Sequence, residues 1–289
     1  MFFGNHSQLG LAANIPVPDP SPVLSYSPIV LDGIPNRPAP LQRRVSIPWL
    51  RALADFLAGR GFAVIQPTFL CSKFYDPAKA TPEEGNEYHW KTGVWDLTTI
   101  LDRLDEIEAA VPGLRPGRLD RERIGIVGHS FGAATINLLM GVVNTDPRFP
   151  GTATNTFGGR DVRRKILPFY GPDFTKLNAP TLVVAGDSGT SMHLTTRGSE
   201  FHMDAYTLAP GPKDLLTLKG GLHCLGGVDG WDAVGTPDTD PQRLGTVQRM
   251  TWAYLRSQLY EGDTAWADAC EALKGLRELG DVQNKAYYW

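Results

Sequence analysis

A serine between two glycines is the residue of this chain best placed to do chemistry. Ser130 stands in Gly128-His-Ser-Phe-Gly132, directly after an apolar run that can form a strand and before small residues that can open a helix. This order predicts a nucleophile elbow, a strand-to-helix turn so tight that the flanking residues must be glycines. The start of the following helix favours the negative charge that forms during attack. We therefore expect Ser130 to act as a nucleophile.

A base for that serine is expected in a glycine-lined loop. A serine hydroxyl is a poor nucleophile near pH 7 and needs a base within hydrogen-bond reach. His223 lies in Lys219-Gly-Gly-Leu-His-Cys-Leu-Gly-Gly227, here called the histidine loop, directly after the apolar run 215–218. A position after the last core strand suits the base of a hydrolase with the chain order serine, acid, histidine. We predict His223 as the base. Structural roles are expected for four other histidines, His89, His129, His193 and His202.

The acid that would orient this base has two candidates. Asp187 directly follows the apolar run 181–186 and has the right place in the chain order. Its alternative role is that of a turn residue, because Gly186-Asp-Ser-Gly189 is typical of a turn. Asp173 is the substitute acid if the carboxylate comes from the preceding strand. The sequence leaves the choice open.

The elements that must position these residues alternate along the chain. Residues 1–45 are rich in proline and are expected to form an arm with short strands, whereas 46–289 are expected to form one domain. Helices are predicted at 46–58 and 94–108, after the elbow, from Asp240-Pro241 onward and from Thr264, with strands at 62–67, before the elbow, at 181–186 and at 215–218. Alternating strands and helices predict a mainly parallel sheet with helices on both faces.

Composition and charge narrow the class of partner. The 289 residues carry a formal net charge of −3 with both signs interspersed, so no patch suits nucleic acid, and no apolar run is long enough for a membrane span. Three cysteines without a C-x-x-C spacing indicate neither a disulfide framework nor a zinc site, so no metal is expected. With no export signal seen at the N-terminus, we expect a cytoplasmic protein with a small-molecule substrate. The sequence does not determine the oligomeric state.

Taken together, these segments resemble the α/β-hydrolase superfamily, most closely the ester hydrolases related to chlorophyllase, platelet-activating-factor acetylhydrolase and dienelactone hydrolase. The likeness covers 52–68, 95–104, the elbow, 179–187, the histidine loop and 252–255. It implies a single-domain α/β-hydrolase fold and hydrolysis of carboxylic esters through an acyl-enzyme. Ser130 would be the nucleophile, His223 the base, and no cofactor would be needed.

The chain departs from the family pattern at three places. The acid often stands three residues after the glycine that ends its strand, but Asp187 comes two places earlier. The family's His-Gly pair, whose following amide completes the oxyanion hole, is absent, and only Asp32-Gly33 resembles it. The oxyanion donors implied are thus the amides of Phe131 and Gly33. Up to two strands of the family's sheet are also missing from the pattern.

Two functions from different classes follow. The first is a serine hydrolase that cleaves small or moderately apolar carboxylic esters with a Ser-His-Asp triad. The second is a catalytically impaired hydrolase-fold binding protein that lacks a complete acid and oxyanion hole. Labelling of Ser130 by a fluorophosphonate distinguishes them.

Overall fold

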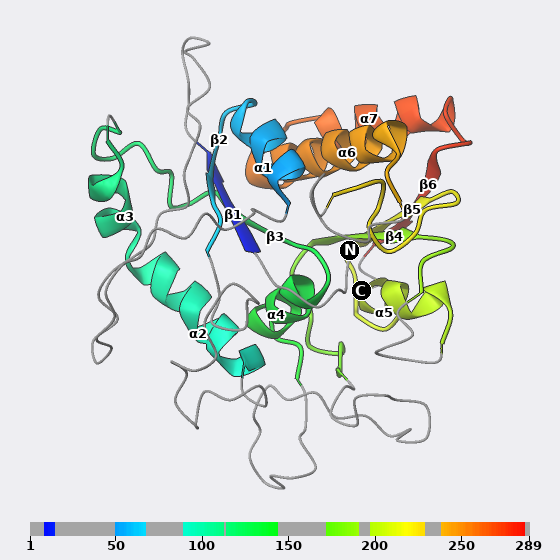
Figure 1. Cartoon of the computed structure of the whole chain (residues 1–289), viewed down its shortest axis with the longest axis horizontal. Coiled ribbons are helices and arrows are strands. Elements are labelled where there is room, and N and C mark those ends of the chain that lie inside the picture. The colour runs from blue at the N-terminus through cyan, green and yellow to red at the C-terminus, as the bar shows by residue number, and fades with distance from the viewer. Residues whose placement is uncertain are drawn as a thin grey trace, which may run out of the picture.

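Helices and strands alternate along most of the chain (Figure 1). The structure is a computed structural model and describes residues 9–14, 50–67, 89–112, 114–143, 172–190, 197–228 and 238–286. The strands are β1 (Leu9–Asn14), β2 (Phe62–Ile65), β3 (Ile124–Gly128), β4 (Thr181–Gly186), β5 (Lys213–Leu218) and β6 (Gly280–Lys285). The helices are α1 (Arg51–Ala58), α2 (His89–Asp102), α3 (Leu104–Ala110), α4 (Phe131–Leu139), the 3-10 helix η4 (Ser199–Met203), α5 (Asp204–Thr207), α6 (Pro241–Leu259) and α7 (Ala265–Lys274).

The described strands form two three-stranded sheets. One has the order β2-β1-β3, with β1 antiparallel to both neighbours, and the other has the order β4-β5-β6. Among the described strands, only β4 and β5 pair in parallel, and β6 is antiparallel to β5. The prediction of a mainly parallel sheet is therefore wrong for the described strands. The cause is the pair of strands that the sequence did not reveal as core strands, β1 and β6, since every antiparallel pairing involves one of them.

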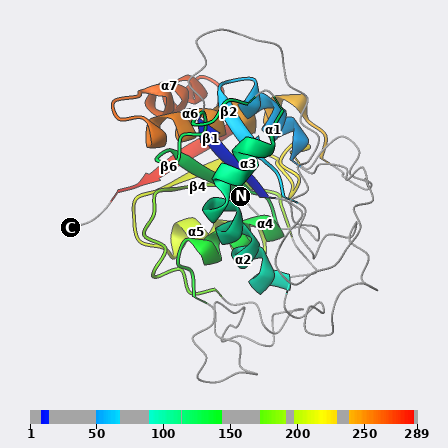
Figure 2. The same ribbon diagram turned by 90° about the vertical axis from the view of Figure 1, so that its left-hand side faces the viewer.

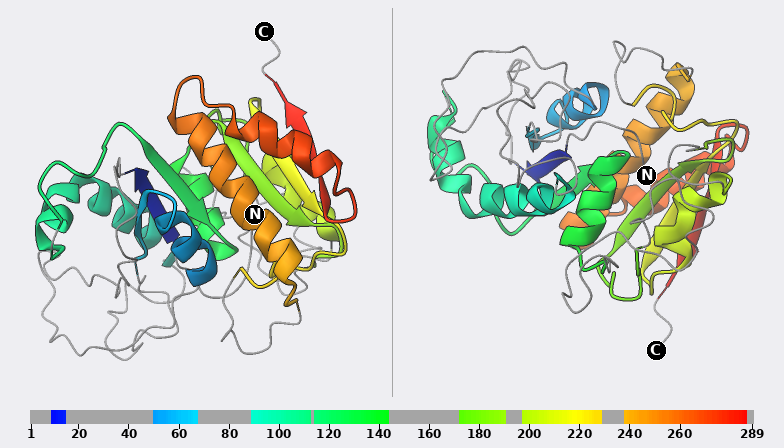
Figure 3. Two further views of the ribbon diagram at one scale, coloured as in Figure 1. Left: turned by 90° about the horizontal axis from the view of Figure 1, so that it is seen from above. Right: turned by 60° about the horizontal axis from the view of Figure 1, so that its bottom comes forward.

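Helices cover both sides of the strands. In Figure 1, α1, α6 and α7 lie on one side and α2, α4 and α5 on the other, and the view turned by 90° shows the same division (Figure 2). Seen from above, α6 and α7 lie over the strands, and α6 runs roughly along them (Figure 3). This arrangement is of the α/β class. None of the helices in the described ranges is long and apolar enough to cross a membrane.

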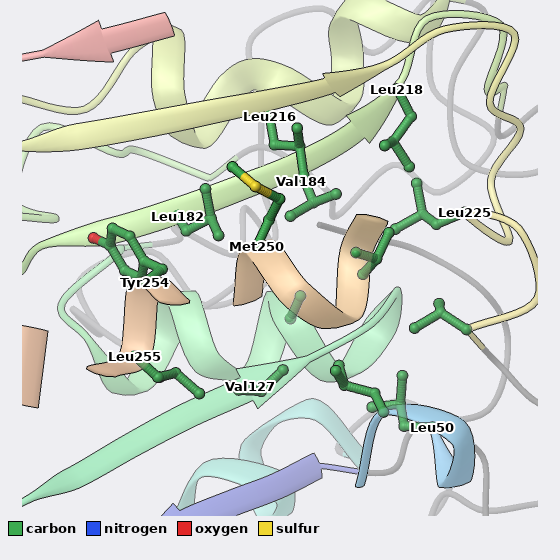
Figure 4. Close-up of a cluster of buried hydrophobic side chains, with 14 of the residues drawn as sticks. Leu50, Val127, Leu182, Val184, Leu216, Leu218, Leu225, Met250, Tyr254 and Leu255 are labelled. Carbon is green, nitrogen blue, oxygen red and sulfur yellow. The ribbon is translucent and has the colours of Figure 1, made fainter. Parts of the chain in front are cut away.

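One apolar cluster links the two sheets. Figure 4 shows α6 passing between β4 and β5 on one side and β3 on the other, with Met250 and Tyr254 beside Leu182 and Val184. Val127, which belongs to the elbow strand, packs into the same cluster. Leu225 of the histidine loop also joins it and is only 2% exposed. Because one core contains the strand before Ser130 and a residue of the histidine loop, packing holds the two candidate catalytic segments together.

The N-terminal segment contributes one described strand. β1 lies within 1–45, the segment expected to carry short strands, and it sits between β2 and β3. The rest of that segment lies outside the described residues.

Candidate active site

The turn at Ser130 is strained. β3 ends at Gly128, α4 begins at Phe131, and Ser130 between them has φ 65° and ψ −130°. A non-glycine residue with positive φ costs on the order of 1–3 kcal/mol and persists only where its surroundings hold it. A Cβ on Gly128 would lie 2.8 Å from the carbonyl carbon of Gly132, so strand and helix approach as closely as the Gly-x-Ser-x-Gly pattern predicts. Ser130 itself is 2% exposed.

The structure brings Ser130 and His223 together. Their side chains are joined by a hydrogen bond of 3.1 Å between Oγ of Ser130 and Nε2 of His223. The serine follows β3 and the histidine lies in the loop that follows β5, so two segments far apart in the chain meet here. At this distance a neutral imidazole can accept the hydroxyl proton.

His129 hydrogen-bonds to the backbone of the histidine loop. Its Nε2 lies 2.9 Å from the backbone oxygen of His223. A carbonyl oxygen only accepts, so Nε2 of His129 carries the proton and donates it. Burial lowers the pKa of His129 to about 4, partly offset by the hydrogen bond to His223. His129 is thus neutral near pH 7 and fixes the backbone of the base.

Two imidazole rings flank the ring of His223. The ring centroids lie 5.0 Å away for His129 and 5.2 Å away for His202, each with an interplanar angle of 40°. His202 is buried in η4. Arg197, which precedes this helix, donates two hydrogen bonds of 2.6 and 2.8 Å to the carboxylate of Asp204, which directly follows it. The sequence predicts a structural role for His202 and gives no sign of its contact with the base. No local pattern links the two positions, because only the tertiary fold brings η4 to the histidine loop.

Asp187 does not hydrogen-bond to His223. Its Oδ1 accepts hydrogen bonds from the backbone N–H of Gly220, at 2.8 Å, and from the hydroxyl of Ser188, at 3.0 Å. The strand register explains this placement, because Gly186 pairs with Leu218, and Asp187 is therefore level with the first residues of the histidine loop. The carboxylate thus fastens the start of that loop.

Asp173 lies at the far end of α4 from Ser130. It forms a β-bridge with Val143, which follows the last turn of α4, whereas Ser130 precedes the first turn. A nine-residue helix is roughly 13 Å long at about 1.5 Å per residue. Its Oδ1 accepts from the backbone N–H of Thr175 at 2.9 Å, and hydrogen bonds from Thr175 lower the pKa of Asp173. The structure thus brings neither predicted carboxylate to His223.

Of the two predicted oxyanion donors, only Phe131 lies in the described residues. Phe131 is the first residue of α4, and a backbone N–H at that position has no acceptor within its own helix. This amide follows the nucleophile directly, where a donor to a developing oxyanion is needed. Gly33 lies outside the described residues.

A buried carboxylate that the sequence does not single out hydrogen-bonds to the histidine loop. Oδ2 of Asp238 accepts hydrogen bonds from the backbone N–H groups of Leu222 and Gly226, both at 3.0 Å. Its Oδ1 accepts from Nη1 of Arg243 at 3.1 Å. Asp238 stands in a stretch with several aspartates, and nothing in its local sequence distinguishes it from them.

Neither the models of known protein families nor the curated proteins match this sequence. Function must therefore be inferred from the chemistry of the site itself.

Proposed function

We propose that this protein is a serine hydrolase that cleaves carboxylic esters of small or moderately apolar molecules. The observation that carries the proposal is the 3.1 Å hydrogen bond between Oγ of Ser130 and Nε2 of His223, made by a serine with φ 65°. Backbone strain of this kind is concentrated at functional sites, because a structure maintains it only against a cost in stability. A serine that merely stabilised the turn would need neither the strain nor the imidazole.

The proposed reaction has two stages. His223 accepts the hydroxyl proton at Nε2 while Oγ of Ser130 attacks the ester carbonyl, and the Phe131 amide donates to the oxygen that becomes negative. The carbon–oxygen bond to the alcohol then breaks, and His223 returns its proton to the departing alcohol. A water molecule, deprotonated by His223, attacks the acyl-enzyme, which releases the carboxylic acid and restores Ser130.

His223 must also be oriented, and the contacts of the described residues favour a loop backbone held in one position as the means. A base must be held in one position for efficient proton transfer. His129 holds the backbone oxygen of His223, and Asp187 holds Gly220 earlier in the same loop. The proposal therefore assigns the chemistry to Ser130 and His223, and it makes Asp187 a triad acid only if its carboxylate proves essential to turnover.

The test is covalent labelling with a fluorophosphonate followed by ester hydrolysis. We expect the probe to modify Ser130, Ser130→Ala to remain unlabelled, and the parent protein to hydrolyse p-nitrophenyl acetate or butyrate. Labelling at another residue, or equal hydrolysis by a folded Ser130→Ala protein, contradicts the proposal.

A second function is favoured by one observation, that neither Asp187 nor Asp173 hydrogen-bonds to His223. A hydrolase fold with a weakened catalytic group could bind an ester or acid without turning it over. Binding without hydrolysis across a varied set of esters, together with no labelling of Ser130, supports this alternative.

A further inference from the structure

Asp238 is an acidic side chain buried under the loop that carries His223. Its side chain is 3% exposed, and its Oδ2 receives the N–H groups of Leu222 and Gly226, one residue before and three residues after the histidine. Burying a charge is costly unless several donors compensate it. Asp238 has such donors, and two of them belong to the histidine loop.

Arg243 connects the same carboxylate to the beginning of the loop. From the first turn of α6 its Nη1 donates to Oδ1 of Asp238 at 3.1 Å, while its Nε donates to the backbone oxygen of Lys219 at 2.9 Å. Together, Asp238 and Arg243 hold the loop at Lys219, Leu222 and Gly226. The loop is therefore fastened on both sides of His223 to the start of one long helix.

The loop also contains a residue that needs such support. Leu225 has φ 51°, which lies in the left-handed region that a leucine rarely adopts. Its side chain is buried in the apolar cluster that links the two sheets, and the backbone N–H of the next residue, Gly226, donates to Asp238. Strained backbone persists where its surroundings fix it from more than one direction. Here core packing holds one side of the strained residue and the carboxylate holds the other.

We propose that Asp238 is a positioning residue for the base: it fixes the backbone of the histidine loop and so keeps Nε2 of His223 at 3.1 Å from Oγ of Ser130. It acts through the loop backbone, since its carboxylate bonds to backbone N–H groups and to Arg243. The catalytic consequence rests on the proposed hydrolase function, whereas the hold on the loop does not. A base displaced by about 1 Å can lose on the order of 100-fold in rate.

Asp240 offers a matched control. It also stands at the start of α6 and pairs with Arg243, at 3.2 Å. Its Oδ1 accepts from Gln242 and Arg243, both within its own helix, so its carboxylate does not hold the histidine loop. Changing Asp240 removes a charge and a helix cap from the same place without removing the bonds to Leu222 and Gly226.

The kinetic test compares three folded variants. We expect Asp238→Ala to lower kcat for p-nitrophenyl butyrate by about 10- to 100-fold with little change in KM, because the base is displaced while the acyl site is kept. Asp238→Asn retains an oxygen that can accept both N–H groups but turns an amide N–H toward Nη1 of Arg243, so it should recover only part of the rate. Asp240→Ala should keep the parental kcat. Equal losses in Asp238→Ala and Asp240→Ala, or a rate in Asp238→Asn as low as that in Asp238→Ala, overturn the proposal.

Hydrogen exchange tests the loop contact without requiring turnover. We expect the amides of Leu222 and Gly226 to exchange faster in Asp238→Ala and at the parental rate in Asp240→Ala. If Asp238→Ala does not fold, Asp238→Glu serves instead, since it keeps the charge but displaces the carboxylate by one methylene group. Parental exchange in the folded variant overturns the positioning role. A parent protein that neither labels nor hydrolyses contradicts the hydrolase function and leaves the exchange result to decide the loop contact.

Discussion

The turn that carries Ser130 and the loop that carries His223 are held in place by different means. The elbow is fixed by neighbours in the chain, because β3 and α4 adjoin it on either side. The histidine loop is fixed by side chains from elsewhere, namely His129, Asp187, Asp238 and Arg243. A nucleophile can thus be encoded within five residues, whereas its base depends on residues spread over more than a hundred positions.

The elbow and the histidine loop have one feature in common, because in each of them two glycines approach closely. Gly128 of the elbow strand faces Gly132 of α4, and Gly186 at the end of β4 faces Gly221 of the histidine loop. The second approach is tighter, because a Cβ on Gly186 would overlap the carbonyl group of Gly221. Close packing of this kind leaves no room for even one methyl group.

Removal of the two reacting groups should produce the largest effect. We expect Ser130→Ala and His223→Ala each to lower kcat for p-nitrophenyl acetate by about 10⁴- to 10⁶-fold, because each loses a group that is needed in the same step. The double variant should be no slower than either single variant. Two outcomes would show that the two side chains do not act as a unit. One is a double variant whose loss in kcat is the product of the two single losses, and the other is a folded single variant, as judged by circular dichroism, with only a few-fold loss in kcat.

A methyl group at each glycine contact tests which segment has less room. We expect Gly186→Ala to lower the free energy of unfolding by about 3 kcal/mol or more, and Gly128→Ala by about 1–3 kcal/mol, as is usual for overpacking. Urea unfolding measures both. Gly262, where an added Cβ would meet nothing within 4 Å, supplies a control whose only expected cost comes from its φ of 78°. A smaller loss for Gly186→Ala than for Gly262→Ala contradicts the tight contact.

Elements defined by local chemistry could be predicted from the sequence. The strand 181–186 matches β4, and the helix predicted to open at Asp240-Pro241 does so, with Asp240 accepting from Gln242 and Arg243. The last helix follows Thr264 as predicted, but the hydroxyl of that residue bonds to Asp268 and does not cap the helix. The first helix begins at Arg51, later than predicted, after Leu50 in a left-handed conformation.

Elements that depend on distant partners could not be predicted. β6 reads Gly-Asp-Val-Gln-Asn-Lys, and so polar a segment becomes a strand only because β5 lies beside it. β1 lies in a proline-rich segment, where the sequence predicts short strands but not their partners. The same distinction holds at the site: the sequence singles out Ser130 and His223, but the role of Asp238 depends on contacts that only the fold creates.

Acid should weaken the contact between the elbow and the loop through His129. The folded pKa of His129 is about 4, against about 6.5 in an unfolded chain. Between these values the unfolded chain binds a proton that the folded protein does not, so the free energy of unfolding falls as pH is lowered from 6.5 toward 4. The loss from this group should total about 3 kcal/mol at most.

Unfolding measured at several pH values in His129→Gln checks this expectation. A glutamine amide can still donate to the backbone oxygen of His223, but it does not titrate. As pH is lowered from 6.5 to 4, we expect the free energy of unfolding to fall less in the variant than in the parent protein. An identical decline in both proteins would show that His129 is not the group that takes up the proton.

The smallest expected effect concerns Asp187 and decides whether the histidine loop needs a triad acid. Because Oδ1 of Asp187 accepts from Gly220, an asparagine that still offers an oxygen should keep the loop in place. We expect Asp187→Asn to lower kcat by less than about tenfold and Asp187→Ala to lower it further, since only the alanine variant leaves the Gly220 N–H without this acceptor.

Asp173→Asn is the matched control, because its carboxylate bonds to Thr175 at the far end of α4 and should leave kcat unchanged. A loss of several orders of magnitude in folded Asp187→Asn would identify Asp187 as the acid of a Ser-His-Asp triad, since exchange of a triad carboxylate for an amide disturbs the protonation of the imidazole. The same loss in Asp173→Asn would assign the role to Asp173. Small effects in both variants would mean that neither Asp187 nor Asp173 orients the base.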